Sequence, residues 1–85
     1  MKILIDGVKT RAEDVPAKIT GTLRCEGPGV LSLPVAQTVG DVDVYAGGVM
    51  SLPVAQSVGD VWVAPNSVLS LPVAQTVGDV DVYAG

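Results

Sequence analysis

Leu33 to Gly47 reads LPVAQTVGDVDVYAG, and the same stretch returns without change at Leu71 to Gly85. A close copy, LPVAQSVGDVWVAPN, lies between them at Leu52 to Asn66. The copies follow a constant 19-residue period and make up more than half of the chain. A short tandem repeat of this kind is typical of a solenoid, in which each unit buries its apolar face against the next.

The middle of each copy alternates valine with polar residues, as a half-buried strand does. In the first copy, Val42 and Val44 are predicted to face the core, while Asp41, Asp43 and Tyr45 face solvent. The Leu-Pro-Val-Ala-Gln connection is too short for a helix and contains proline, so we expect extended or polyproline-like backbone there. The valines predicted to be buried in the three copies are Val42, Val44, Val61, Val63, Val80 and Val82.

The 19-residue register continues upstream of the clear copies, because Ala17 and Gly21 fall on the positions of Ala36 and Gly40. The predicted fold is therefore all-β, a parallel β-solenoid of about four stacked 19-residue coils with a short N-terminal cap. The predicted units are a cap at 1–14, whose first strand ends at the Asp6-Gly7 turn, and a solenoid at 15–85 with coils at about 15–30, 31–49, 50–68 and 69–85.

The apolar spacing within a coil resembles the leucine-rich repeat pattern L-x-x-L-x-L-x-x-N-x-L-x-x-L, with valine in place of leucine. The chain is also similar to the irregular leucine-rich repeats of receptor L-type domains, in which LP…VGG-x-L-x-V units recur. The resemblance covers about residues 15–85 and implies a solenoid that presents one exposed face to ligands. The matching positions of the first clear coil are Val39, Val42, Val44, Gly47, Val49 and Leu52.

The pattern departs from this family in two respects. Asn66 stands at the family's asparagine position, but Gly47 and Gly85 replace asparagine in the other copies. A continuous asparagine ladder is therefore excluded, and we expect glycine to turn the corner there with a positive φ. The 19-residue period is also shorter than the family's usual repeat length, which favours a compact β-solenoid over a wide horseshoe.

The net charge of −4 is unevenly distributed along the chain. The segment that ends at Glu26 holds all five basic residues and four acidic ones, while the remainder holds five acidic residues and no base. Binding to nucleic acid requires a basic stripe, so a nucleic acid is not expected as a partner. The regular carboxylates leave open a third, weaker hypothesis, in which the protein is an acidic decoy of nucleic acid.

The apolar runs and the single cysteine bear on location. No apolar run approaches the roughly 20 residues that span a bilayer, and Asp6 interrupts the apolar start where a signal peptide would continue. A membrane is therefore not expected as a partner. With Cys25 as the single cysteine, an intramolecular disulfide is impossible, which favours a reducing compartment. We predict a cytoplasmic protein.

The residue types that most catalytic sites need are scarce. The chain contains no histidine, which excludes an ordinary catalytic triad and an imidazole metal site. Cys25 falls on an inward position, where a thiol behaves as a small apolar side chain. No glycine-rich phosphate loop opens a helix. We therefore predict that the protein is not an enzyme and uses no cofactor.

Stacking would place equivalent residues of successive coils in columns on the outside of the sheet. Trp62 is the single tryptophan and a candidate anchor for another protein, since tryptophan is enriched in binding hot spots. The alternative is an ordinary surface aromatic that covers its neighbours. The predicted partner-binding face consists of Arg24, Asp43, Tyr45, Trp62, Asp81 and Tyr83.

One column holds three carboxylates, Asp41, Asp60 and Asp79. Because clustered carboxylates are the ligands of Ca²⁺, the alternative function is a cation- or carbohydrate-binding module that uses the Asp, Trp and Tyr side chains of this face. The competing interpretation is that each aspartate accepts a hydrogen bond from its own turn or extends into solvent. No calcium-type glycine-aspartate nonapeptide is present, which favours this second interpretation, and no metal site is predicted.

The last repeat unit is followed by no capping segment in the sequence. We therefore expect its strand to present unpaired N–H and C=O groups beside an uncovered apolar core. Pairing two such ends would cover both, although the carboxylates beside the strand oppose it. The predicted function is a non-enzymatic repeat protein that binds another protein and forms a homo-oligomer through its C-terminal coil. The predicted self-association edge comprises Asp79, Val80, Asp81, Val82 and Tyr83.

Overall fold

The computed structural model describes residues 2–45 and 47–82, and every structural statement below concerns these residues. Most of them lie in short strands. The elements are β1 (Lys2–Ile5), β2 (Val8–Thr10), η1 (Ala12–Asp14), β3 (Lys18–Glu26), β4 (Gly29–Ser32), β5 (Thr38–Tyr45), β6 (Gly48–Ser51), β7 (Ser57–Val58), β8 (Val61–Val63), β9 (Val68–Ser70), β10 (Thr76–Val77) and β11 (Val80–Val82).

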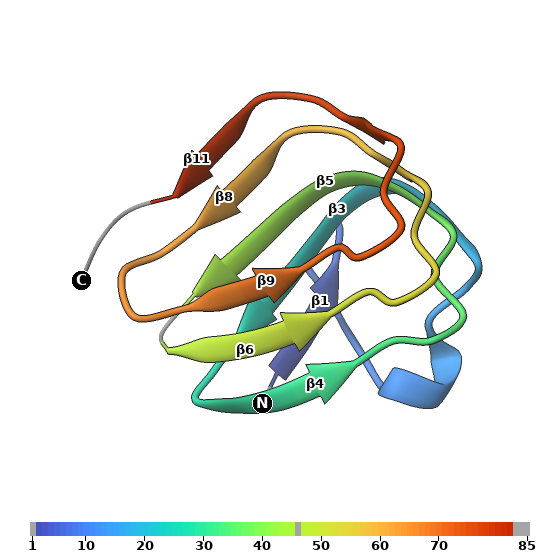
Figure 1. Ribbon diagram of the computed structural model, residues 1–85. Helices are drawn as coiled ribbons and strands as arrows, with labels where there is room; N and C mark the ends of the chain where they lie inside the picture. Colours follow the sequence, from blue (N-terminus) through green and yellow to red (C-terminus); the bar gives the residue numbers. More distant parts are fainter. Residues whose placement is uncertain (1, 46, 83–85) are drawn as a thin grey trace.

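The strands form two walls that face each other across the core (Figure 1). In the larger sheet, β3, β5, β8 and β11 lie side by side and parallel, with β7 and β10 continuing the same levels. In the smaller sheet, β4, β6 and β9 are parallel and in register. Four levels in one wall and three in the other give about three turns of the predicted parallel β-solenoid.

The 19-residue register predicted from the sequence is the register of the strands. Leu23 pairs with Val42, Val42 with Val61, and Val61 with Val80. Each residue therefore stacks on its counterpart one repeat away, and the inward side chains form continuous apolar columns. Equivalent repeat positions meet at each level because the repeat length equals one turn of the coil.

The facing prediction is confirmed for the inner coils and wrong for the last one. Val42 and Val44 are fully buried, and Val61 and Val63 are each only 3% exposed. Val80 and Val82, which were also predicted to be buried, are 54% and 65% exposed. The reason is that within the described residues no strand lies on the outer edge of β11, so nothing covers the last level.

The N-terminal residues close the opposite end of the core. β1 and β2 form a hairpin whose Asp6-Gly7 turn has φ values of 52° and 80°, as a two-residue hairpin turn requires. β1 pairs antiparallel with β3, so Ile3 lies on Cys25 and is only 6% exposed. The predicted cap is therefore present, and the helical turn η1 follows the hairpin.

The corners follow the turn chemistry of the repeat. Gly47 and Asn66 occupy the same register position and have φ values of 76° and 64°, so the expected left-handed corner is confirmed. The Leu-Pro-Val-Ala connection was expected to be extended but forms a tight turn, in which the Ala36 amide donates to the Leu33 carbonyl at 3.4 Å. Proline fits the second position of such a turn because its ring already holds φ at the value which that position needs.

No helix of the described segments is long and apolar enough to cross a membrane.

Val61 and Val80 form a matched pair for mutation, because they share a register position and differ in whether a coil covers them. Val61→Asp should lower the free energy of unfolding by at least about 3 kcal/mol, since it buries an unpaired charge. Val80→Asp should change it by no more than about 1 kcal/mol, as surface substitutions do. Urea denaturation of dilute protein, followed by circular dichroism, measures both. Equal destabilisation by the two variants would contradict this assignment of the core.

Candidate functional site

The outer surface of the larger sheet carries the predicted columns. Arg24, Asp43, Trp62 and Asp81 are register partners on β3, β5, β8 and β11. Glu26 and Tyr45 are partners in the neighbouring column. The structure therefore brings together the predicted partner-binding face except for Tyr83, which lies outside the described residues together with that part of the predicted association edge.

The aromatic side chains of this face contact each other diagonally across the strands. The rings of Tyr45 and Trp62 have centroids 4.5 Å apart and planes inclined at 42°. The guanidinium carbon of Arg24 lies 4.2 Å from the centre of the Tyr45 ring, and its Nε lies 2.9 Å from Oε2 of Glu26. Arginine over an aromatic face and tilted ring pairs are both favourable contacts. Trp62 is thus half-buried in a stack that joins three levels, as a surface aromatic that covers its neighbours would be.

Asp43 lies between Arg24 and Trp62 in its column. Partial burial raises the pKa of the Asp43 carboxyl above its ordinary value, with Asp41 adding to this effect and Arg24 opposing it. The carboxyl thus holds its proton to a somewhat higher pH in the folded protein than in the unfolded chain.

The aspartate column is a ladder of hydrogen bonds between coils. The Asp60 amide donates to Oδ1 of Asp41 at 3.1 Å, and the Asp79 amide donates to Oδ1 of Asp60 at 3.0 Å. At the capped end, the Thr22 amide donates to Oδ1 of Asp6 at 2.9 Å. Asp41 and Asp60 therefore each bind the main chain of the following coil, whereas the sequence analysis favoured a bond to the aspartate's own turn or a carboxylate extended into solvent.

The glycine that precedes each aspartate makes this ladder possible. A Cβ atom on Gly78 would lie 2.6 Å from Oδ1 of Asp60, and one on Gly59 would lie 3.0 Å from Oδ1 of Asp41. A Cβ atom on Gly59 would collide first with the Gly40 carbonyl oxygen, so the glycines admit both the carboxylate and the close approach of the neighbouring main chain. The Gly-Asp pair in each of the three clear copies is the sequence signal for this ladder.

A shallow polar hollow of about 140 Å³ opens on the same face. Four aspartates and Trp62 are among the residues that line it. In the described part of the chain, no group of three or more His, Cys, Asp or Glu side chains is arranged to hold a metal ion. The residues lining the hollow are Thr22, Asp41, Asp43, Asp60, Val61, Trp62 and Asp81.

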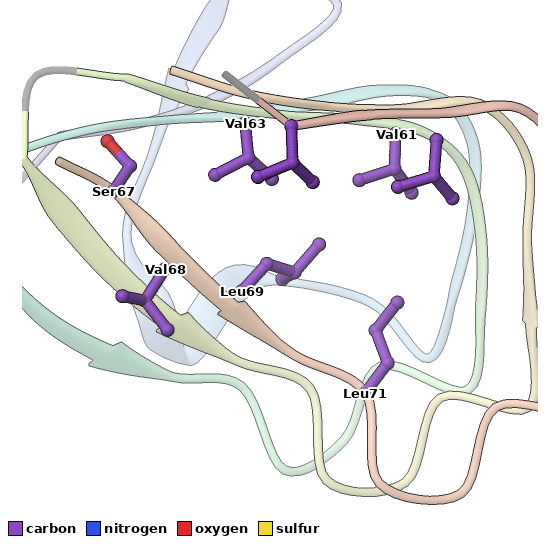
Figure 2. Close-up of a pocket in the computed structure, with 8 residues that line it drawn as sticks. Val61, Val63, Ser67, Val68, Leu69 and Leu71 are labelled. Carbon is purple, nitrogen blue, oxygen red and sulfur yellow. The ribbon is translucent and has the colours of Figure 1, made fainter. Parts of the chain in front are cut away.

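A second, apolar hollow of about 280 Å³ lies at the uncovered end of the core. Figure 2 shows Leu69 and Leu71 on one wall and Val61 and Val63 on the facing wall, with the hollow between them. We call this region the open end and define it by its lining residues, which are Val61, Val63, Ser67, Val68, Leu69, Leu71, Val80 and Val82. The sequence predicted the uncovered edge but not the hollow, which depends on the distance between the walls.

Cys25 lies in the core, as its inward position predicted, and is fully buried. Burial raises the pKa of its thiol to about 11, and the neighbouring Glu26 adds to this effect. Because the thiolate is the reactive form of cysteine, this environment suppresses nucleophilic chemistry at physiological pH.

Comparison with protein families, with curated proteins and with solved structures found no match to this chain. The resemblance to leucine-rich repeats is supported by the structure only as far as a β-solenoid of about three turns.

The carboxylate ladder predicts different effects for two substitutions of Asp60. Asp60→Asn keeps an oxygen acceptor for the Asp79 amide and removes one of several repelling charges, so stability should equal or exceed that of the wild type. Asp60→Ala removes the acceptor and should cost about 1 kcal/mol. Thermal unfolding compares them. Equal losses for both variants, or a saturable change of Trp62 fluorescence on adding Ca²⁺, would support a cation site instead.

Proposed function

We propose that this protein is a non-enzymatic β-solenoid that acts by binding protein, and first of all by associating with itself through the open end. The observation that carries the proposal is the contrast between equivalent residues. Val44 is fully buried where a following coil covers it, whereas Val82 is 65% exposed. The difference in exposure between these two valines indicates how much apolar surface a partner at the open end would remove from water.

The backbone at the open end supports the same proposal. The Val42 amide donates to the Asp60 carbonyl at 2.8 Å, and the Val61 amide donates to the Asp79 carbonyl at 2.7 Å. By the same register, the amide of Val80 points towards the strand position beyond β11. An edge of this kind is a template for strand addition.

The outer face is the second candidate for protein binding. Its stacked Arg24, Tyr45 and Trp62 side chains and its acidic hollow favour a partner with a basic side chain over a carbohydrate, because the carboxylates dominate the lining. The resemblance to leucine-rich repeats would assign ligand binding to this face. The cytoplasmic location favoured by the single cysteine belongs to the same proposal.

Self-association is tested by sedimentation velocity over a range of protein concentrations. The wild-type mass should rise above 8.6 kDa as concentration increases. Val82→Asp should remain monomeric at concentrations where the wild type associates, because the charge would have to be buried in the contact. Val30→Asp is the matched control, since Val30 is 80% exposed on β4 in the first coil, away from the open end.

Both variants should keep the circular dichroism spectrum of the wild type, because both valines are largely exposed. A wild-type mass of 8.6 kDa at every concentration would overturn the proposal. So would loss of association in Val30→Asp but not in Val82→Asp.

A further inference from the structure

Both walls of the last coil present the same pattern at the open end. In the larger sheet, the inward side chains of Val80 and Val82 flank the outward Asp81. In the smaller sheet, the inward side chains of Leu69 and Leu71 flank the outward Ser70. Each wall therefore ends in an apolar, polar, apolar triplet that reads the same in both directions.

The capped end of the chain shows which strand arrangement covers such a triplet. β1 runs antiparallel to β3, and its Ile3 and Ile5 pair with Cys25 and Leu23. Ile3 and Ile5 are apolar residues two positions apart, and they cover two inward residues of the first coil. An antiparallel strand with alternating apolar residues is thus the cap that this solenoid already uses.

We propose that the open end is covered by the open end of a second copy of this chain, related to it by a two-fold axis that passes through Asp81 and Ser70. The proposal rests on the self-association proposed above and specifies its geometry. The axis places Val80 opposite Val82 of the second copy, and Leu69 opposite Leu71 of the second copy. Each copy covers the triplets of the other copy with its own identical triplets. One contact therefore closes the open ends of both copies.

The hydrogen-bonding groups at the edge of β11 fit this axis. The Val42 amide and the Val44 carbonyl both bond to the following coil, so the equivalent amide of Val80 and carbonyl of Val82 point outward from β11. The axis brings these groups together as a hydrogen-bonded antiparallel pair. An axis shifted by half a residue would place inward residues opposite outward ones, which the pleat does not allow.

The dimensions of the molecule limit the area of the contact. The Cα atoms span 30 × 26 × 20 Å, so an end face measures about 400–600 Å² and a pair of copies buries about 800–1,200 Å². That area is at the lower end of specific interfaces. The dimer is therefore weak, with micromolar or higher dissociation constants.

The negative charge at the two-fold axis weakens the dimer further. It also gives the proposed axis a measurable signature. Asp81 of each copy lies opposite its counterpart in a pair without hydrogen bonds, where Cα atoms approach to about 4.5 Å. Like charges directly opposite each other are destabilising. The charged groups around Asp81 are also acidic, since Asp41, Asp43 and Asp60 line the same hollow. Added salt should strengthen the dimer by screening this repulsion.

A charge swap tests the axis directly. Wild type and Asp81→Lys are mixed in equal amounts, and native mass spectrometry counts the two homodimers and the heterodimer. Each homodimer places like charges together, whereas the heterodimer places a lysine opposite an aspartate. Random mixing gives as much heterodimer as the two homodimers together, and this ratio should rise by at least about threefold. Glu13→Lys, an exposed substitution on η1 at the other end of the molecule, should mix with the wild type statistically.

The outcomes separate the geometry from association itself. Statistical mixing of Asp81→Lys with the wild type would overturn the axis while leaving self-association intact. Assemblies larger than dimers would do the same. A monomeric wild type would overturn both proposals. Asp81→Asn is an independent test of the axis. The dissociation constant of the Asp81→Asn homodimer should be about two- to fivefold lower than that of the wild type, because the repulsion is lost. An unchanged or higher value would contradict the axis.

Discussion

The stacking of one coil on the next, in a fixed 19-residue register, is the interaction on which the rest of this structure depends. The chain has 85 residues and almost no large aromatic side chains, so a single compact core would bury a modest share of its surface. Repetition solves this problem, because each coil supplies the apolar face that its neighbour must cover. Leu23, Val42 and Val61 form one such column, and each is buried by the level that follows it.

Stacking also places like charges next to each other, and the Gly-Asp pair offsets the resulting repulsion. Identical coils bring identical carboxylates into one column, where they repel. Here, Asp41 and Asp60 each accept an amide hydrogen bond from the following coil, and the glycines leave the space that the carboxylates occupy. These amide hydrogen bonds offset the repulsion, because each stabilises the folded chain by about 1 kcal/mol. The same residues therefore fix the register, which explains why they recur in every copy.

Much of the fold can be predicted from the sequence because the same apolar pattern recurs in several copies. The inward valines of the inner coils, the corner at Gly47 and the cap strand were all predictable from periodicity and turn chemistry. The hydrogen-bond partner of each aspartate was not predictable, because a periodic pattern shows which residues share a column but not the direction in which a side chain points. The stack of Arg24 on Tyr45 depends on diagonal contacts, which register alone does not specify. Val80 was assigned by analogy with its buried counterparts, and the analogy failed where the neighbouring coil is missing from the described chain.

Amide hydrogen exchange of dilute, monomeric protein tests most directly the claim that each coil is stabilised by the one that follows. Val42, Val61 and Val80 share one register position. The first two amides donate to the following coil, so they should exchange at least about 100-fold more slowly than the Val80 amide. Equal protection at the three positions would contradict this account, because the stability of each coil would then not depend on its neighbour.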